Sequence, residues 1–132
     1  MVSMTIEYGS LDGTGASIGC AGNHTLIADR PPGKAGGLGL GFNGGELLAL
    51  AIGGCFCNDV HYCAHELGLE VSRLRVKVTI EFDGDPLLAT RSVLGATCEL
   101  LDGTSPDEVL SRARARSAVA NSLRAGVPVL FE

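Results

Sequence analysis

Residues 43–68, which read NGGELLALAIGGCFCNDVHYCAHELG, constrain the fold of this chain more than any other stretch. The stretch opens on Asn43, a residue type that caps helix N-termini well, and closes on Gly68, the type preferred just past a helix C-terminus. No proline interrupts the residues between them, so the sequence predicts one long helix. This helix carries three of the five cysteines of the chain: Cys55, Cys57 and Cys63.

The apolar pattern changes along this helix. At about 100° per residue, the residues from Leu47 to Phe56 place apolar side chains on every side, which predicts burial on every side. After Cys57 the apolar and polar residues separate onto different arcs, and polar residues from Asn58 onward end the apolar run well short of the roughly 20 residues of a membrane span. We therefore predict a core helix, with Cys55 where the buried half meets the first polar groups.

Length and charge exclude several classes of protein. A chain of 132 residues predicts a single domain over residues 1–132, and its 45% hydrophobic content in so small a chain favours an obligate oligomer. The net charge of −5 and the aromatic content of 5% argue against a nucleic-acid partner, which would need a basic stripe or stacking platforms.

The N-terminus and the cysteines indicate a compartment. MVSMTIEYGS lacks the basic region and apolar run of a secretory signal, and five cysteines at this spacing do not form a disulfide framework. We expect a cytoplasmic protein with no membrane association. Its cysteines are then either buried small hydrophobic residues or reactive thiols.

The remaining elements predict an α+β fold in the order β-β-β-α-β-β-α-β. A capping-box signal at 105–108 begins the second helix, and Gly126 ends it. The glycine- and proline-rich stretch 30–42 is either a flexible linker or, as we expect, a functional loop or lid. The expected strands are 2–8, 16–21, 24–29, 70–82, 87–101 and 127–131, and the second helix is 105–125.

Three groups of residues offer candidate chemistry. The glycines of 36–45 are weak as a nucleotide site, because no βαβ unit surrounds them, and we expect no cofactor. Cys57, His61 and His65 share one helix stripe and offer three metal ligands, although a polar helix face is the simpler interpretation. Cys55 is either a structural cysteine or a catalytic one, which would need a cation brought by tertiary structure because the helix N-terminus is too distant.

Residues 24–78 resemble the OsmC/Ohr family, whose long central helix carries an Asn-Pro-Glu-(Glu/Gln)-Leu-Leu…Ala-Cys-Phe signature and precedes a strand of period two. The version here, GFNGGELL…GGCFCND, indicates a subgroup, and the order of elements agrees over nearly the whole chain. The resemblance implies an OsmC-like fold and an intertwined homodimer. In it the two central helices pack back to back and the active sites lie at the interface.

The resemblance also implies reduction of organic hydroperoxides in oxidative-stress defence. One cysteine attacks the peroxide and becomes a sulfenic acid, and a second forms a disulfide with it, while an arginine and a glutamate keep the first reactive. Cys55 matches the peroxidatic cysteine and Arg30 the arginine of one branch. The expected ligands are a small hydrophobic peroxide and an external thiol reductant.

Two positions depart from the family pattern. Where the family has the second cysteine in a Cys-Pro-Val run, this chain has Ser117, which cannot form a disulfide. Where the family has its glutamate, this chain has Gly45, and Glu46 could serve only if the helix start shifts or rotates. We take Cys55, Arg30 and Glu46 as the candidate catalytic residues.

The missing second cysteine leaves several cycles open. Cys57 diverges from Cys55 by about 200° around the helix, which makes a disulfide between them geometrically poor, whereas Cys63 and Cys98 stay open as partners. A one-cysteine cycle completed by an outside thiol is chemically sufficient. The alternative function is a non-enzymatic relative that binds a small apolar ligand at the dimer interface.

Overall fold

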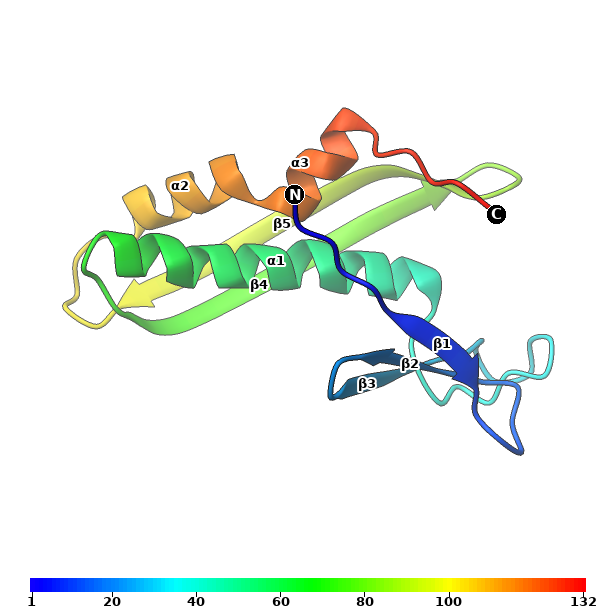
Figure 1. The fold of residues 1–132 in the computed structure, drawn as a ribbon. Helices are drawn as coiled ribbons and strands as arrows, with labels where there is room; N and C mark the ends of the chain where they lie inside the picture. The colour runs from blue at the N-terminus through cyan, green and yellow to red at the C-terminus, as the bar shows by residue number, and fades with distance from the viewer. The chain divides into compact units, whose positions relative to one another are not determined.

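A long antiparallel hairpin organises the second half of the chain in the computed structural model, which describes all 132 residues (Figure 1). It consists of β4 (Val71–Asp83) and β5 (Leu88–Leu100), with Leu74 opposite Cys98 and Val78 opposite Leu94. These bounds and the alternation of half-buried and exposed side chains confirm the predicted strands. Phe82 is an exception, because the register shifts between Glu81 and Phe82 and leaves that ring exposed.

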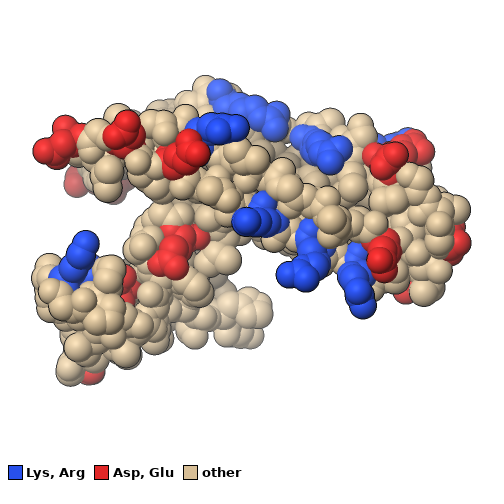
Figure 2. Space-filling model, turned by 180° about the vertical axis from the view of Figure 1, so that it is seen from behind, with Lys and Arg blue, Asp and Glu red and all other residues tan.

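The helix α1 (Gly44–Glu66) packs on one face of this hairpin together with α2 (Asp107–Arg116) (Figure 1). Their contact forms the hydrophobic core, and the inward residues of β4 and β5 pack against it. The core residues are Phe56, Val60, Cys63, Ala64, Leu100, Val109, Leu110 and Ala113. The outward face of β4 carries Arg73, Arg75 and Lys77, and Figure 2 shows basic side chains in a row over the hairpin.

The predicted ends of α1 are confirmed. The side chain of Asn43 accepts a hydrogen bond from the Glu46 amide at 2.8 Å, and Glu46 Oε1 accepts one from the Asn43 amide at 3.1 Å, which is a capping box. Gly68 has the left-handed backbone (φ 69°) that ends helices.

The prediction that residues 47–56 of α1 are buried on every side is wrong within this chain. Leu50 is 52% exposed, and Ala51 and Gly54 are exposed as well, because the hairpin and α2 cover only one side of the helix. By length and composition α1 could also cross a membrane, but core helices of soluble proteins meet the same criterion, so this indication is weak.

The predicted second helix is broken in two. α2 ends at Arg116, and α3 (Ala118–Ala125) begins after Ser117, whose extended backbone (φ −63°, ψ 107°) interrupts the helical path. The side chain of Asn121 donates to the Ala115 carbonyl and so satisfies an acceptor near the break. The predicted capping box is also absent, because Glu108 instead pairs with Arg112 at 2.8 Å.

The first part of the chain forms a three-stranded antiparallel sheet in the order β1-β2-β3. The strands are β1 (Glu7–Ser10), β2 (Ser17–Ala21) and β3 (His24–Ala28). A tight turn at residues 22–23, where Gly22 has a positive φ, joins β2 to β3. The first strand is shorter than predicted, and the strand expected at 127–131 is absent, because neither segment finds a partner edge within the chain.

The α+β class is therefore confirmed, with two helices at the end of the chain in place of a helix and a strand. The structure divides into two compact units, Met1–Leu47 and Leu48–Glu132, and the single domain expected from the length stays a prediction.

Val109 tests the core between α1 and α2, since its side chain is completely buried there. We expect Val109→Ala to lower the free energy of unfolding by about 2 kcal/mol, because the cavity it leaves cannot fully collapse. Urea denaturation followed by circular dichroism measures this change. Val93→Thr, at an exposed position of β5, is the control and should change stability by less than about 0.5 kcal/mol; equal losses would place the core elsewhere.

Candidate functional site

Cys55 lies on α1 with a partly exposed side chain. Its Sγ lies 3.6 Å from Oδ2 of Asp59, one helical turn further on, in a geometry in which the thiol donates to the carboxylate. No role was assigned to Asp59 from the sequence, although its i, i+4 spacing from Cys55 predicts that the two side chains are neighbours on the helix. The polar partner of this thiol is therefore a proton acceptor rather than the cation that usually activates a catalytic cysteine.

A cation does approach the same face of α1 from the end of α2. Nη1 of Arg116 lies 2.8 Å from both carboxylate oxygens of Glu66. This hydrogen bond lowers the pKa of Glu66 and raises the pKa of Arg116, and the charge of Asp59 raises the pKa of Arg116 further. Sequence reasoning missed Arg116, because its contact with Glu66 joins residues 50 positions apart.

Arg30 is held within the N-terminal unit. Its Nη2 donates to the Gly15 carbonyl at 2.7 Å and lies 3.6 Å from Oδ1 of Asp29, while its Nε is buried without a partner. The guanidinium thus joins the turn before β2 to the loop after β3. A role for Arg30 toward Cys55 stays a prediction.

Asp29 organises the glycine-rich loop and was also missed by the sequence analysis. Its buried carboxylate accepts hydrogen bonds from the backbone amides of Leu40, Leu38 and Arg30, at 3.0, 3.1 and 2.8 Å. These bonds hold the pKa of Asp29 below its ordinary value against the opposing effect of burial, and the bond from Leu40 has the largest effect on that pKa. Gly41 completes the loop, because a side chain there would overlap the Ile27 carbonyl.

Glu46 is engaged by the capping box at the start of α1, so its carboxylate already has a hydrogen-bond donor in the Asn43 amide. Its proposed part in activating a thiol is not tested by this geometry. Gly45 precedes it and offers no side chain that could take over.

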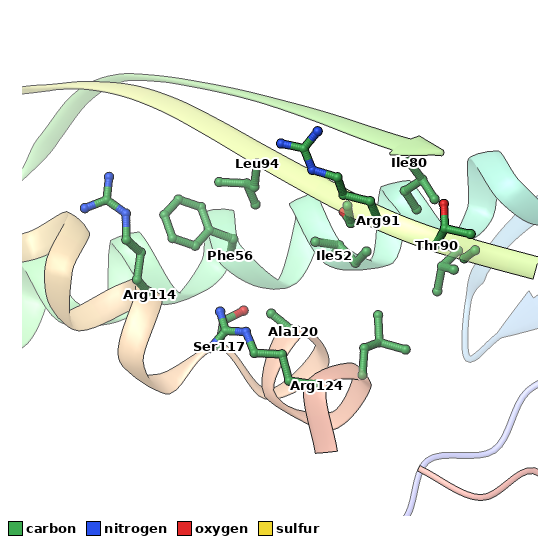
Figure 3. Close-up of a pocket in the computed structure, with 14 residues that line it drawn as sticks. Ile52, Phe56, Ile80, Thr90, Arg91, Leu94, Arg114, Ser117, Ala120 and Arg124 are labelled. Carbon is green, nitrogen blue, oxygen red and sulfur yellow. The ribbon is translucent and has the colours of Figure 1, made fainter. Parts of the chain in front are cut away.

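A cavity of about 590 Å³ lies within the C-terminal unit, between α1, the tip of the hairpin and α3 (Figure 3). Its walls are mainly apolar, and Ile52 and Phe56 of α1 face Ala120 of α3 across it. Ser117 lines the cavity, is 1% exposed, and has no hydrogen-bond partner for its hydroxyl. Cys55 is not among the lining residues.

Residues 35–132, about three quarters of the chain, match the family described as OsmC-like protein. This chain belongs to the OsmC-like family. None of the curated proteins compared with it matches.

Solved structures of OsmC-like proteins have the same fold. An OsmC-like protein of unknown function from Vibrio cholerae is 14% identical, with a TM-score of 0.76 over 92% of this chain and 94% of that one. An OsmC-like protein from Mycoplasma pneumoniae is 17% identical, with a TM-score of 0.76 over 96% and 89%. The organic hydroperoxide resistance protein OhrB of Bacillus subtilis is 19% identical, with a TM-score of 0.56 over 99% and 97%.

Three of the other thiols of this OsmC-like chain, those of Cys57, Cys63 and Cys98, are less suited to chemistry, whereas Cys20 on β2 is exposed. All five cysteines are free, and Cys63 is completely buried in the core. Burial raises the pKa of Cys57, and burial together with the charge of Glu99 raises the pKa of Cys98, so both stay protonated at neutral pH. A disulfide between Cys55 and Cys63 or Cys98 stays untested.

The metal interpretation receives no support from the geometry. Cys57 is half-buried while His61 and His65 are exposed, and the chain brings together no group of three His, Cys, Asp or Glu side chains that could hold a metal ion. The arrangement favours the simpler interpretation, a polar helix face.

Asp29 provides a test of the loop that carries Arg30. In Asp29→Asn the uncharged side chain accepts fewer hydrogen bonds, so we expect trypsin to cut after Lys34 about tenfold faster. Asp12→Asn, at an exposed position before β2, is the control and should leave the rate unchanged. Equal rates for all three proteins would mean that Asp29 does not hold the loop.

The same loop should respond to acid in a defined direction. Because the folded pKa of Asp29 lies below the unfolded value, its stabilisation is complete above about pH 4 and is lost as the pH falls through the folded pKa. Hydrogen exchange at the Leu38 and Leu40 amides, corrected for the intrinsic pH dependence, measures this loss.

Proposed function

We propose that this chain is a thiol-dependent hydroperoxide reductase with Cys55 as the nucleophile, in the subgroup with the GFNGGELL…GGCFCND motif. The observation that carries the proposal is the partly exposed Cys55 thiol on α1, in contact with a proton acceptor; the resemblance matches this residue to the family's peroxidatic cysteine. Family membership and the likeness to an organic hydroperoxide resistance protein support it.

In the proposed reaction the Cys55 sulfur attacks the outer oxygen of the hydroperoxide and the O–O bond breaks. The thiol proton passes to the leaving alkoxide, so that the products are a sulfenic acid and an alcohol. Asp59 is placed to accept the thiol proton and hand it on. Arg30, as in one branch of the family, or Arg116, from the end of α2, supplies the positive charge.

In the proposed cycle no second cysteine of the chain takes part, because the family resemblance aligns Ser117 with the resolving cysteine of other members. An external thiol attacks the sulfenic acid, giving water and a mixed disulfide with Cys55. A second external thiol then releases the reduced enzyme and leaves with the first as a disulfide. This reducing cycle fits a cytoplasmic protein.

A homodimer is part of the proposal. The uncovered face of α1 combines apolar or small residues with Asn58, His61 and His65, and at Gly54 an added Cβ atom would meet no atom of the same chain within 4 Å. A second copy of α1 packed on this face would remove the exposed Leu50 side chain from water. The exposed residues on this face are Leu50, Ala51, Gly54, Asn58, His61, Tyr62 and His65.

Chemical trapping tests the nucleophile. After treatment with cumene hydroperoxide, dimedone should label Cys55 in preference to the exposed Cys20, and Cys55→Ser should reduce the peroxide-dependent labelling at least roughly tenfold because the proposed sulfenic acid forms only on Cys55. Cys57→Ser is the control two residues away and should keep the label. Mass spectrometry that finds undiminished label in Cys55→Ser would reject Cys55 as the nucleophile.

Sedimentation tests the dimer. Gly54→Leu should weaken self-association at least about tenfold, because a large side chain there holds two α1 helices apart while the single chain has room for it. Ser111→Leu adds the same side chain at an exposed position of α2 and should leave association unchanged. A Gly54→Leu protein that associates like the unmodified chain would place the dimer contact elsewhere.

A second candidate function is ligand binding without chemistry. The observation in its favour is the cavity that contains Ser117, which is lined mainly by apolar residues and has a volume typical of small-molecule sites. This cavity lies within one chain, whereas the alternative expected from the sequence placed the ligand at the dimer interface.

A further inference from the structure

We propose that the cavity between α1, the hairpin tip and α3 binds an amphipathic carboxylate, an aliphatic chain that ends in a carboxylate group. The inference rests on the second candidate function, ligand binding, and names the ligand class. It does not depend on the chemistry of Cys55, which does not line the cavity.

The walls of the cavity fit the aliphatic part. Ile52 and Phe56 come from α1, Ile80 and Leu94 from the hairpin, and Leu123 from α3, so apolar side chains from three elements surround the space (Figure 3). A chain of methylene groups placed between these side chains would be removed from contact with water on all sides. The volume of about 590 Å³ lies within the range of small-molecule sites.

Ser117 indicates that a polar group belongs in the same space. Its hydroxyl is buried and has no hydrogen-bond partner in the chain, a costly state for a polar group. The extended backbone of Ser117 also separates α2 from α3, which places this residue at the wall of the cavity. A ligand oxygen that accepts from the hydroxyl would satisfy it.

The charges around the cavity indicate that this polar group is an anion. Three arginines line the cavity and no acidic residue does, although the chain as a whole has a net charge of −5. Arg114 and Arg124 form no ion pair, whereas Arg112 and Arg116 on the same segment are paired with glutamates. The third, Arg91, makes only a long contact of 3.9 Å with Glu81.

A carboxylate matches these donors best. A guanidinium binds a carboxylate through two parallel hydrogen bonds, and the match is stronger where the site excludes water. Figure 3 shows the guanidinium of Arg124 beside Ser117, so a carboxylate there would meet both charge and hydroxyl, while Arg114 lies further along the wall. The apolar walls then hold the rest of the molecule.

Calorimetry with octanoate and with 1-octanol, which has the same chain length without the charge, tests the proposal on the full-length protein. We expect octanoate to bind at least roughly tenfold more tightly than octanol. The double variant Arg114→Gln/Arg124→Gln should remove this preference and leave octanol binding unchanged. Arg112→Gln, on α2 outside the cavity, is the matched control and should bind octanoate like the unmodified protein.

Three results would overturn the assignment of a carboxylate ligand. They also distinguish a failure of this assignment from a failure of the second candidate function, ligand binding. Equal affinity for octanoate and octanol rejects the carboxylate while ligand binding stands. Acetate that competes as well as octanoate rejects the aliphatic part. Binding of neither compound rejects the site and the second candidate function together. If circular dichroism shows that the double variant is unfolded, Ser117→Ala replaces it as the test. A several-fold loss of octanoate affinity in Ser117→Ala supports the site, and unchanged affinity opposes it.

Discussion

The packing of α1 against the hairpin and α2 is the constraint on which the C-terminal unit depends. Phe56, Val60 and Cys63 of α1 meet Leu100 of β5 and Val109 of α2, and this contact sets the rotation of α1 about its axis. That rotation decides which α1 residues are buried. It sends Ile52 and Phe56 into the cavity, leaves Leu50 and Gly54 uncovered, and puts Cys55 at the boundary between them.

Local signals in the sequence account for what could be predicted. The N-cap at Asn43, the glycine at Gly68 and the period-two pattern of 70–82 act within a few residues, so the long helix and the hairpin were predicted closely. The ion pair of Arg116 with Glu66 and the hydrogen bonds from Leu38 and Leu40 to Asp29 depend on how distant or looping segments meet. No periodicity or capping rule contains that information.

The break at Ser117 shows the same limit within a local segment. Residues 105–125 have the composition of one helix, yet the extended backbone of Ser117 divides them. The side-chain amide of Asn121 donates to the Ala115 carbonyl and so satisfies an acceptor near the break. The resemblance seen in the sequence had already marked position 117, as the place where a serine would stand for the family's second cysteine. The sequence therefore identified the residue and its missing thiol, while its effect on the helix and on the cavity required the structure.

The three amides gathered on Asp29 make the glycine-rich segment a cooperative unit. Losing one of these hydrogen bonds weakens the geometry of the other two, because the Asp29 carboxylate accepts all three. Arg30 belongs to the same unit through its contacts with Asp29 and Gly15. The glycine-rich segment should therefore open as a whole. The same opening would release the Arg30 guanidinium from its contacts, so the Asp29 carboxylate controls whether that guanidinium is available to other groups.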